Sequence, residues 1–168
     1  MTQDAVAALR AGQAVILPTD TVYGLCVLPG HEDVLSELKG RDRSKPVALL
    51  AADVEALVAA VPGLDRSLLE SYLPGPYTLV VGNVGVRVPN LPAAAAEVVR
   101  AVGVVAATSA NLSGGVDPRR LEDVPEEIRA GCAAVVDAGE LPGVPSTVID
   151  LTGDEPRVLR RGAGPVPE

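Results

Sequence analysis

Hydrophobic positions in this chain recur with two spacings, and the two alternate along its length. Apolar residues three and four positions apart indicate amphipathic helices, whereas short apolar runs rich in Val and Leu are typical of strands. The first spacing predicts helices at residues 4–11, 32–39, 53–60, 65–72, 93–102 and 125–130. The apolar runs predict strands at residues 14–17, 47–50, 78–81, 85–88, 104–107, 133–136, 147–151 and 157–159.

The order of these elements predicts the fold class. Strands and helices alternate, but two neighbouring pairs of strands have no helix between them, and Gly82 and Asn83 form a hairpin-like break within one pair. We therefore expect an α/β fold with a mixed rather than purely parallel sheet. No linker or repeat divides the chain, so residues 1–168 are expected to form one domain.

Composition narrows the class of protein. A chain of 168 residues with 48% hydrophobic and 21% charged residues is long enough for one soluble domain with its own core. Its apolar runs stop well short of the roughly 18 residues that a membrane span needs. Asp4 and Arg10 interrupt the N-terminal stretch before it could resemble a signal peptide. We expect a cytoplasmic protein without membrane contact.

Charge and metal-ligand content exclude some functions. The formal net charge of −8 argues against broad adsorption to nucleic acid, which needs a cationic surface, although a local basic pocket remains compatible with it. Cys26 and Cys132 form no CxxC pair, and His31 is the only histidine in the sequence. A zinc site or a Ser-His-Asp triad is therefore not expected.

Hydroxyl and amide side chains gather in three short segments at predicted strand ends. The segments are residues 18–25 (Pro-Thr-Asp-Thr-Val-Tyr-Gly-Leu), 107–114 (Ala-Thr-Ser-Ala-Asn-Leu-Ser-Gly) and 145–150 (Pro-Ser-Thr-Val-Ile-Asp). One such segment alone would be read as a turn or a helix cap. Three of them together favour a backbone-lined pocket for a polar ligand.

Basic residues are concentrated in one run. The chain has twelve Arg and two Lys, and both lysines lie in residues 39–45 (Lys-Gly-Arg-Asp-Arg-Ser-Lys). Four cations in seven residues suit a polyphosphate, although a solvated charged turn is the alternative. The chain contains neither GxxxxGK[ST] nor GxGxxG, so the common nucleotide-binding motifs are missing. Arg87 and Arg160, beside Pro or Gly at strand ends, are isolated cations that could hold a carboxylate or phosphate.

Seven motifs in order resemble the YrdC/Sua5 family. They are Pro18-Thr-Asp-Thr-Val-Tyr-Gly-Leu25, Lys39-Gly-Arg41 with Lys45-Pro46, Leu73-Pro-Gly-Pro-Tyr-Thr78, Val86-Arg-Val-Pro89, Thr108-Ser-Ala-Asn-Leu-Ser-Gly114, Pro145-Ser-Thr-Val-Ile-Asp150 and Leu159-Arg-Arg-Gly162. The resemblance runs from about residue 5 to residue 164. It implies a twisted open sheet of parallel and antiparallel strands with flanking helices, in the short, single-domain form of the family.

The resemblance also implies a reaction, that of an L-threonylcarbamoyladenylate synthase, a nucleotidyltransferase. L-Threonine, bicarbonate and ATP would give threonylcarbamoyl-AMP and pyrophosphate. Mg²⁺ would be held with the ATP phosphates rather than by protein side chains alone, and no prosthetic group would be needed. A separate transferase complex would then pass the threonylcarbamoyl group to an adenosine of tRNA.

Residue roles follow from the resemblance, motif by motif. Arg41 and Lys45, with Lys39 beside them, would be the catalytic cations on the ATP phosphates. The nucleotide would also contact Asn83, Ser109, Asn111, Asp117 and Arg160. Threonine would bind to Thr21, Arg87, Ser146 and the backbone at Ala107, with Arg87 on its carboxylate. Tyr23 is the aromatic residue expected closest to the site.

Two other classes of function remain open at this point. One is binding of tRNA or other double-stranded RNA through the concave face of the same fold, against which stand the net charge of −8 and the scarcity of aromatic residues. The other is a carbamoyl-transfer module, because the same fold serves in larger carbamoyltransferases. Pyrophosphate release that depends on threonine would separate the synthase from both.

Overall fold

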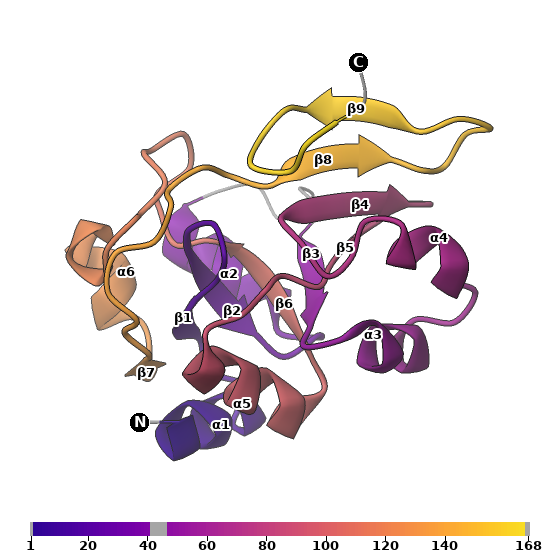
Figure 1. Cartoon of the computed structure of the whole chain (residues 1–168). Helices are drawn as coiled ribbons and strands as arrows, with labels where there is room; N and C mark the ends of the chain where they lie inside the picture. The colour runs from indigo at the N-terminus through magenta and orange to yellow at the C-terminus, as the bar shows by residue number, and fades with distance from the viewer. Residues whose placement is uncertain (1, 41–46, 167–168) are drawn as a thin grey trace.

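A mixed β-sheet forms the centre of the computed structural model, which describes residues 2–40 and 47–166 (Figure 1). Within these residues the strand order is β7-β1-β2-β6-β3-β5-β4-β8-β9. The strands are β1 Val15–Pro18, β2 Tyr23–Val27, β3 Ala48–Ala51, β4 Tyr77–Val81, β5 Val84–Arg87, β6 Val104–Ser109, β7 Ala134–Val135, β8 Thr147–Asp150 and β9 Arg157–Arg160. The helices are α1 Thr2–Arg10, α2 Glu32–Lys39, α3 Val54–Ala60, α4 Arg66–Glu70, α5 Ala93–Val102 and α6 Glu126–Ala130, with a 3₁₀ turn at Leu121–Asp123.

The sheet combines both strand directions, as the element order predicts. Strands β1 and β7, β3 and β5, and β4 and β8 pair in parallel, while the remaining pairs are antiparallel. The mixed α/β fold is therefore confirmed.

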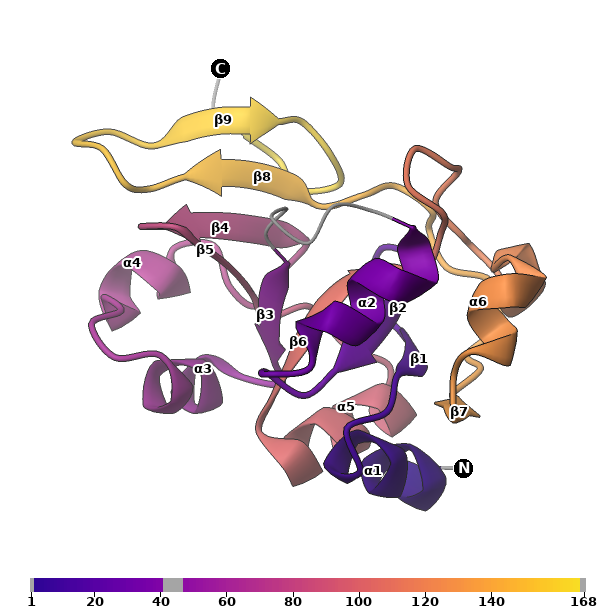
Figure 2. The same cartoon turned by 180° about the vertical axis from the view of Figure 1, so that it is seen from behind.

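Helices cover both faces of the sheet around its β1–β2–β6 part. Val15 and Leu17 of β1 pack in one cluster with α1 and α5, whereas Ile16 between them packs in a second cluster with α2 and α6. Figures 1 and 2 show these helices on either side of the strands. Alternate residues of a strand point to opposite faces, so a strand covered on both sides is apolar at every position.

A third cluster lies under the other half of the sheet. It joins α3 and α4 to strands β4, β5 and β8, with Leu57, Leu79 and Ile149 at its centre. Asp53, the N-cap of α3, accepts a 2.7 Å hydrogen bond from the backbone N–H of Ala56. This bond satisfies one of the free N–H groups of the first helical turn.

The predicted elements agree with the structure to within two residues at each end, with one exception. Strand β2 was not predicted, because Gly24 and the hydroxyl residues before it favour a turn. In the fold β2 is an internal strand that pairs with β1 on one side and β6 on the other. Among the described residues, none of the helices has the length and apolar character that crossing a membrane requires.

Candidate active site

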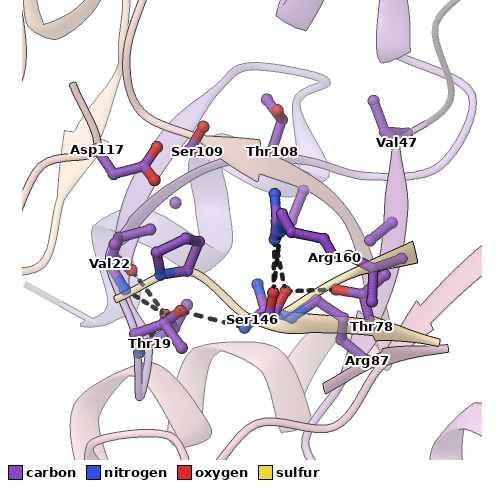
Figure 3. Close-up of a pocket in the computed structure, with 16 residues that line it drawn as sticks. Thr19, Val22, Val47, Thr78, Arg87, Thr108, Ser109, Asp117, Ser146 and Arg160 are labelled. Atoms are coloured by element: carbon purple, nitrogen blue, oxygen red, sulfur yellow. Dashed lines mark hydrogen bonds between the residues drawn. The ribbon is translucent and has the colours of Figure 1, made fainter. Parts of the chain in front are cut away.

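A pocket of about 230 Å³ opens where the three hydroxyl-rich segments meet (Figure 3). The residues around it come from the β1–β2 connection and the ends of strands β3 to β6, β8 and β9. They are Thr19, Thr21, Val22, Gly24, Val47, Ala48, Thr78, Arg87, Ala107, Thr108, Ser109, Asp117, Pro145, Ser146, Val148 and Arg160. The convergence that the sequence predicts is therefore present in the fold.

Sheet register explains why distant segments meet here. Gly24 of β2 lies opposite Ser109 of β6, and Thr78 of β4 lies beside Val148 of β8. A register shift in the β8–β9 pair then places Arg160 opposite Val148. Irregularities of this kind re-aim side chains at the ends of strands, and here one brings a guanidinium to the pocket.

Arg87, at the end of β5, is a sequestered cation with few partners. Its side chain is 13% exposed, and Nη2 donates a 3.3 Å hydrogen bond to Oγ1 of Thr21 and lies 3.6 Å from Oδ1 of Asp20. Arg87 Nε and Asp20 Oδ1 are buried without a hydrogen-bond partner. The guanidinium thus retains donor capacity inside the pocket.

The electrostatic environment of Arg87 favours an anion. Burial lowers the pKa of Arg87 below its ordinary value, Asp20 opposes that shift, and the nearby charge of Arg160 adds to it. Burial likewise raises the pKa of Asp20, against a hydrogen bond from the Asn90 backbone N–H and the charge of Arg87. Burial thus disfavours the charged forms of both Arg87 and Asp20. The carboxylate of a ligand would stabilise the charged guanidinium of Arg87.

Ser146 and Arg160 form the wall next to Arg87. The guanidinium of Arg160 donates to the carbonyl oxygen of Ser146 from Nη2 at 2.8 Å and from Nε at 3.1 Å, and Nη2 also reaches Oγ of Ser146 at 3.2 Å. The hydroxyl of Ser146 shares a further 2.7 Å hydrogen bond with that of Thr78. Figure 3 shows these contacts gathered on one side of the pocket, across from Asp117 and Ser109.

Lys39 organises the opposite wall. This residue ends α2 and is 5% exposed, and its ammonium donates 2.8 Å bonds to the carbonyl oxygen of Ser109 and to Oδ1 of Asn111. It also lies 3.3 Å from the hydroxyls of Thr108 and Ser109. Gly40 ends the helix directly afterwards with a φ of 67°, a left-handed conformation that glycine adopts without strain.

Asn111 carries this network on to Asp117. Its Oδ1 accepts bonds from Lys39 and from the Ser109 hydroxyl, while Nδ2 donates to the carbonyl oxygen of Gly115 and to Oδ1 of Asp117, each at 3.0 Å. Each polar atom of the Asn111 side chain is therefore occupied within the protein. Asn111 holds the loop after β6 in place, and Asp117 presents its carboxylate at the pocket.

Most of the residues expected at the site are brought together. Thr21, Arg87, Ala107, Ser109, Asp117, Ser146 and Arg160 line the pocket, and Lys39 and Asn111 bond to its lining. Arg41 and Lys45 lie outside the described residues. Asn83 is exposed in the β4–β5 turn and is not among the lining residues.

Tyr23, the aromatic residue expected closest to the site, lies in the core between the pocket-lining residues Val22 and Gly24. The residue is fully buried, packs with Ile16, Leu25 and other residues of the second cluster, and does not line the pocket. Its hydroxyl donates towards the carbonyl oxygen of Gly139 at 2.7 Å and lies 3.0 Å from Oδ1 of Asp137. In strand β2 it is Gly24, one position later, that faces the pocket.

The sequence reasoning passed over three polar residues that shape the site. Thr19 is buried and accepts the backbone N–H groups of Thr21 and Val22, which folds the β1–β2 connection. Thr78 bonds Ser146, and Asp20 stands behind Arg87. All three belong to the quoted motifs, and the signal that could have found them is a polar side chain at a predicted strand end.

A metal site built from protein side chains alone was not expected. In the part of the chain that the structure describes, no group of three or more His, Cys, Asp or Glu side chains is placed to hold a metal ion.

Comparison with known proteins identifies the family. A family model named for Sua5, YciO and YrdC, and described as "Telomere recombination", matches residues 7–162. The chain belongs to the Sua5/YciO/YrdC family. A Mycobacterium tuberculosis (H37Rv) member is 37% identical over 94% of this chain and 82% of its own length. That protein carries the provisional name threonylcarbamoyl-AMP synthase.

Two further members of the Sua5/YciO/YrdC family are longer. The Bacillus subtilis protein named threonylcarbamoyl-AMP synthase is 34% identical over 94% of this chain and 52% of its own length. The Pyrococcus abyssi Sua5 structure, solved in complex with L-threonine, matches with a TM-score of 0.85 and 32% identity over 96% of this chain and 54% of that chain. This chain thus spans about half the length of these two relatives.

Proposed function

We propose that this chain is a threonylcarbamoyl-AMP synthase, a nucleotidyltransferase that uses L-threonine, bicarbonate and ATP. The observation that carries the proposal is Arg87, a sequestered guanidinium with an unpartnered Nε in a pocket of hydroxyl groups. Its environment suits the carboxylate of an amino acid. The names of the family members and the threonine complex of the Pyrococcus protein support threonine as that amino acid.

The reaction proceeds in two bond-forming steps. The threonine amine attacks the carbon of bicarbonate, a C–N bond forms and water leaves, which gives a carbamate. A carbamate oxygen then attacks the α-phosphorus of ATP, a P–O bond forms, and the bond to the β-phosphate breaks with release of pyrophosphate. Positioning and fixed positive charge serve such a transfer between anions, so a catalytic histidine is not required.

The two walls of the pocket divide the substrates. Arg87 would bind the threonine carboxylate, with Thr21, Ser146 and the backbone at Ala107 around the rest of the amino acid. The nucleotide would contact Ser109, Asn111 and Asp117 on the opposite wall. Arg160 would cover the nucleotide from a position between the two walls. Lys39 would act through the Ser109 and Asn111 oxygens that it bonds.

The phosphate side extends to residues outside the described part of the chain. Arg41 and Lys45 are proposed to contact the triphosphate, with Mg²⁺ arriving as part of the ATP complex. The product would be passed to a transferase complex that modifies tRNA. The proposed contact of Arg41 and Lys45 with the triphosphate is supported by the sequence that follows them, because residues 47 and 48 line the pocket.

The test is a pyrophosphate assay with ATP, bicarbonate and each of the twenty amino acids in turn. We expect release with threonine that stops when either bicarbonate or ATP is omitted, and detection of threonylcarbamoyl-AMP by mass spectrometry. Carbamoyl phosphate in place of bicarbonate and threonine tests carbamoyl transfer, and a tRNA gel shift across salt concentrations tests RNA binding. Absence of amino-acid-dependent pyrophosphate release would overturn the proposal.

A further inference from the structure

Thr147 lies immediately behind the pocket without lining it. It is the first residue of β8, follows Ser146 directly and is fully buried. Its hydroxyl accepts a 3.0 Å hydrogen bond from the backbone N–H of Gly162 and donates a 2.6 Å bond to the carbonyl oxygen of Gly164. One buried side chain therefore holds two points of the segment formed by residues 162–165.

That segment has two further anchors. The backbone N–H of Ala163 donates to the carbonyl oxygen of Pro145 at 2.9 Å, and the hydroxyl of Tyr77 donates to the carbonyl oxygen of Pro165 at 2.6 Å. The segment is thus tied to Pro145 and Thr147, the two neighbours of Ser146.

The fit leaves no room for side chains at two positions. A Cβ on Gly162 would meet the carbonyl oxygen of Pro145 and lie 2.6 Å from the carbonyl carbon of Ser146. A Cβ on Gly164 would lie 2.5 Å from Cε1 of Tyr77. The contacts at Gly162 are with backbone atoms and cannot be relieved by turning a side chain, so the segment requires glycine there. At Gly164 the contact is with the ring of Tyr77, whose hydroxyl is itself bonded to the carbonyl oxygen of Pro165, so a side chain there would displace this anchor.

The anchored segment controls the place of Arg160, two residues before Gly162. The β8–β9 pair shifts register between Val148 and Ile149, so the strand ladder by itself does not determine which residue of β9 faces the pocket. Arg160 makes its side-chain hydrogen bonds to Ser146, the residue next to Thr147. Fixing Gly162 on Thr147 sets the distance over which Arg160 reaches Ser146.

We propose that Thr147 is a positioning residue for the reaction, which holds residues 162–165 so that Arg160 and Ser146 keep their places in the pocket. The inference rests on the proposed function and adds a residue that contacts neither the reacting atoms nor the pocket. A purely structural threonine would affect stability alone, whereas a positioning residue changes substrate binding through Arg160.

The test compares Thr147→Val, which keeps the shape and removes both hydrogen bonds, with Thr147→Ser, which keeps the hydroxyl. We expect Thr147→Val to raise the KM for threonine or ATP at least tenfold and Thr147→Ser to restore it to within about threefold of the wild type. Thr152→Val is the matched control, since it removes the 2.6 Å bond between Thr152 and Asp150 in the same hairpin, away from the pocket. This control should leave both KM values unchanged.

A double-mutant cycle with Arg160→Ala separates positioning from general damage. If Thr147 acts through Arg160, Thr147→Val should cost little more in the Arg160→Ala background, because the two changes disable one unit. Additive losses in kcat/KM would overturn the inference. Should Thr147→Val fail to fold, Tyr77→Phe removes an outer anchor, and we expect a smaller rise in the same KM.

Hydrogen exchange supplies a readout that is independent of turnover. Faster exchange at Gly162 and Ala163 in Thr147→Val, with wild-type kcat and KM, would show that the segment is released without consequence and would overturn the inference. A wild-type protein that releases no pyrophosphate with threonine would instead overturn the proposed function, so the two failures are distinguishable.

Discussion

Lys39 and Arg87 are buried cations on opposite walls of the site, and they differ in how many hydrogen-bond acceptors the protein gives them. Lys39 has four oxygen atoms within 3.3 Å of its ammonium, from Thr108, Ser109 and Asn111. Among the described residues, Arg87 donates one side-chain hydrogen bond of 3.3 Å to Thr21, lies 3.6 Å from a carboxylate oxygen of Asp20, and has an Nε without a partner.

This difference indicates two kinds of work for buried positive charge. A cation whose donors are filled by the protein stabilises the arrangement of the groups around it, and removing it leaves their oxygens without a donor. A cation with unfilled donors has lost hydration without full compensation, so a ligand anion gains what the protein does not supply. We therefore propose that Lys39 is an organising charge and that Arg87 is a receptor for a ligand anion.

The largest expected effect comes from removing the receptor. Arg87→Ala should lower kcat/KM for threonine by about 100-fold or more, because truncating a buried partner of an ion pair costs about 2–5 kcal/mol. Arg87→Lys should fall between, since an ammonium keeps the charge but not the planar fork. Initial rates of pyrophosphate release across threonine concentrations measure both. An unchanged KM for threonine in Arg87→Ala would remove Arg87 from the receptor role.

Removing the organising charge should affect stability and activity together. Lys39→Met removes the lysine donor from the Ser109 carbonyl oxygen and one of the two donors to Asn111 Oδ1, so we expect the free energy of unfolding to fall by about 2 kcal/mol. The KM for ATP should rise as the Ser109–Asp117 loop loosens. Urea unfolding and ATP-dependent initial rates check the two effects.

The matched control for Lys39 is an exposed cation. Arg66 pairs with Glu55 at 2.6 Å and with Glu70 at 3.7 Å on the surface, where ion pairs contribute little. Arg66→Met should leave both the free energy of unfolding and the reaction rates nearly unchanged. If Lys39→Met behaved like Arg66→Met, the contrast between organising and receptor cations would not hold.

The part of the site that could be predicted from the sequence is the set of polar residues at the ends of predicted strands. Thr21, Ser109 and Ser146 are small polar residues beside apolar runs, and the carboxyl or amino ends of neighbouring strands meet in a sheet. How many partners each cation has could not be predicted, because those partners come from pairings between segments far apart in the chain. The Lys39 network, for example, joins residues 72 positions apart.

Strand β2, which was not predicted, explains why Tyr23 does not line the pocket. The prediction lacks strand β2 and expects Tyr23, within segment 18–25, to be the aromatic residue closest to the site. In the strand, alternation sends Tyr23 and Leu25 to the α2–α6 cluster and leaves Gly24 towards the pocket. Glycine by itself favours a turn, and it is the pairing of Gly24 with Leu17 of β1 and Ser109 of β6 that makes it part of a strand.

Tyr23 should therefore matter to stability and not to the nucleotide. Tyr23→Phe removes the hydroxyl that bonds Gly139 and Asp137 and that accepts the backbone N–H of Ala138 at 3.0 Å. We expect the free energy of unfolding to fall by about 1–2 kcal/mol, with an unchanged KM for ATP. A raised KM for ATP at unchanged stability would instead mean that Tyr23 contributes to nucleotide binding.

The smallest effect is expected at Asp137, on the exposed side of the same contact. A hydrogen bond from the Gly139 backbone N–H, and then one from the Tyr23 hydroxyl, lower the pKa of Asp137 below its ordinary value. A carboxyl group with a lowered pKa stabilises the fold above its unfolded pKa, and this stabilisation is lost as the pH falls through the folded value. Asp137→Asn should thus be less stable than the wild type at pH 7, and the difference should shrink in urea titrations below about pH 4. Because Asp137 lies away from the pocket, threonine-dependent rates at pH 7 should not change. A change in these rates would mean that the contact between Asp137 and Tyr23, on one face of β2, affects the pocket that Gly24 lines on the other face.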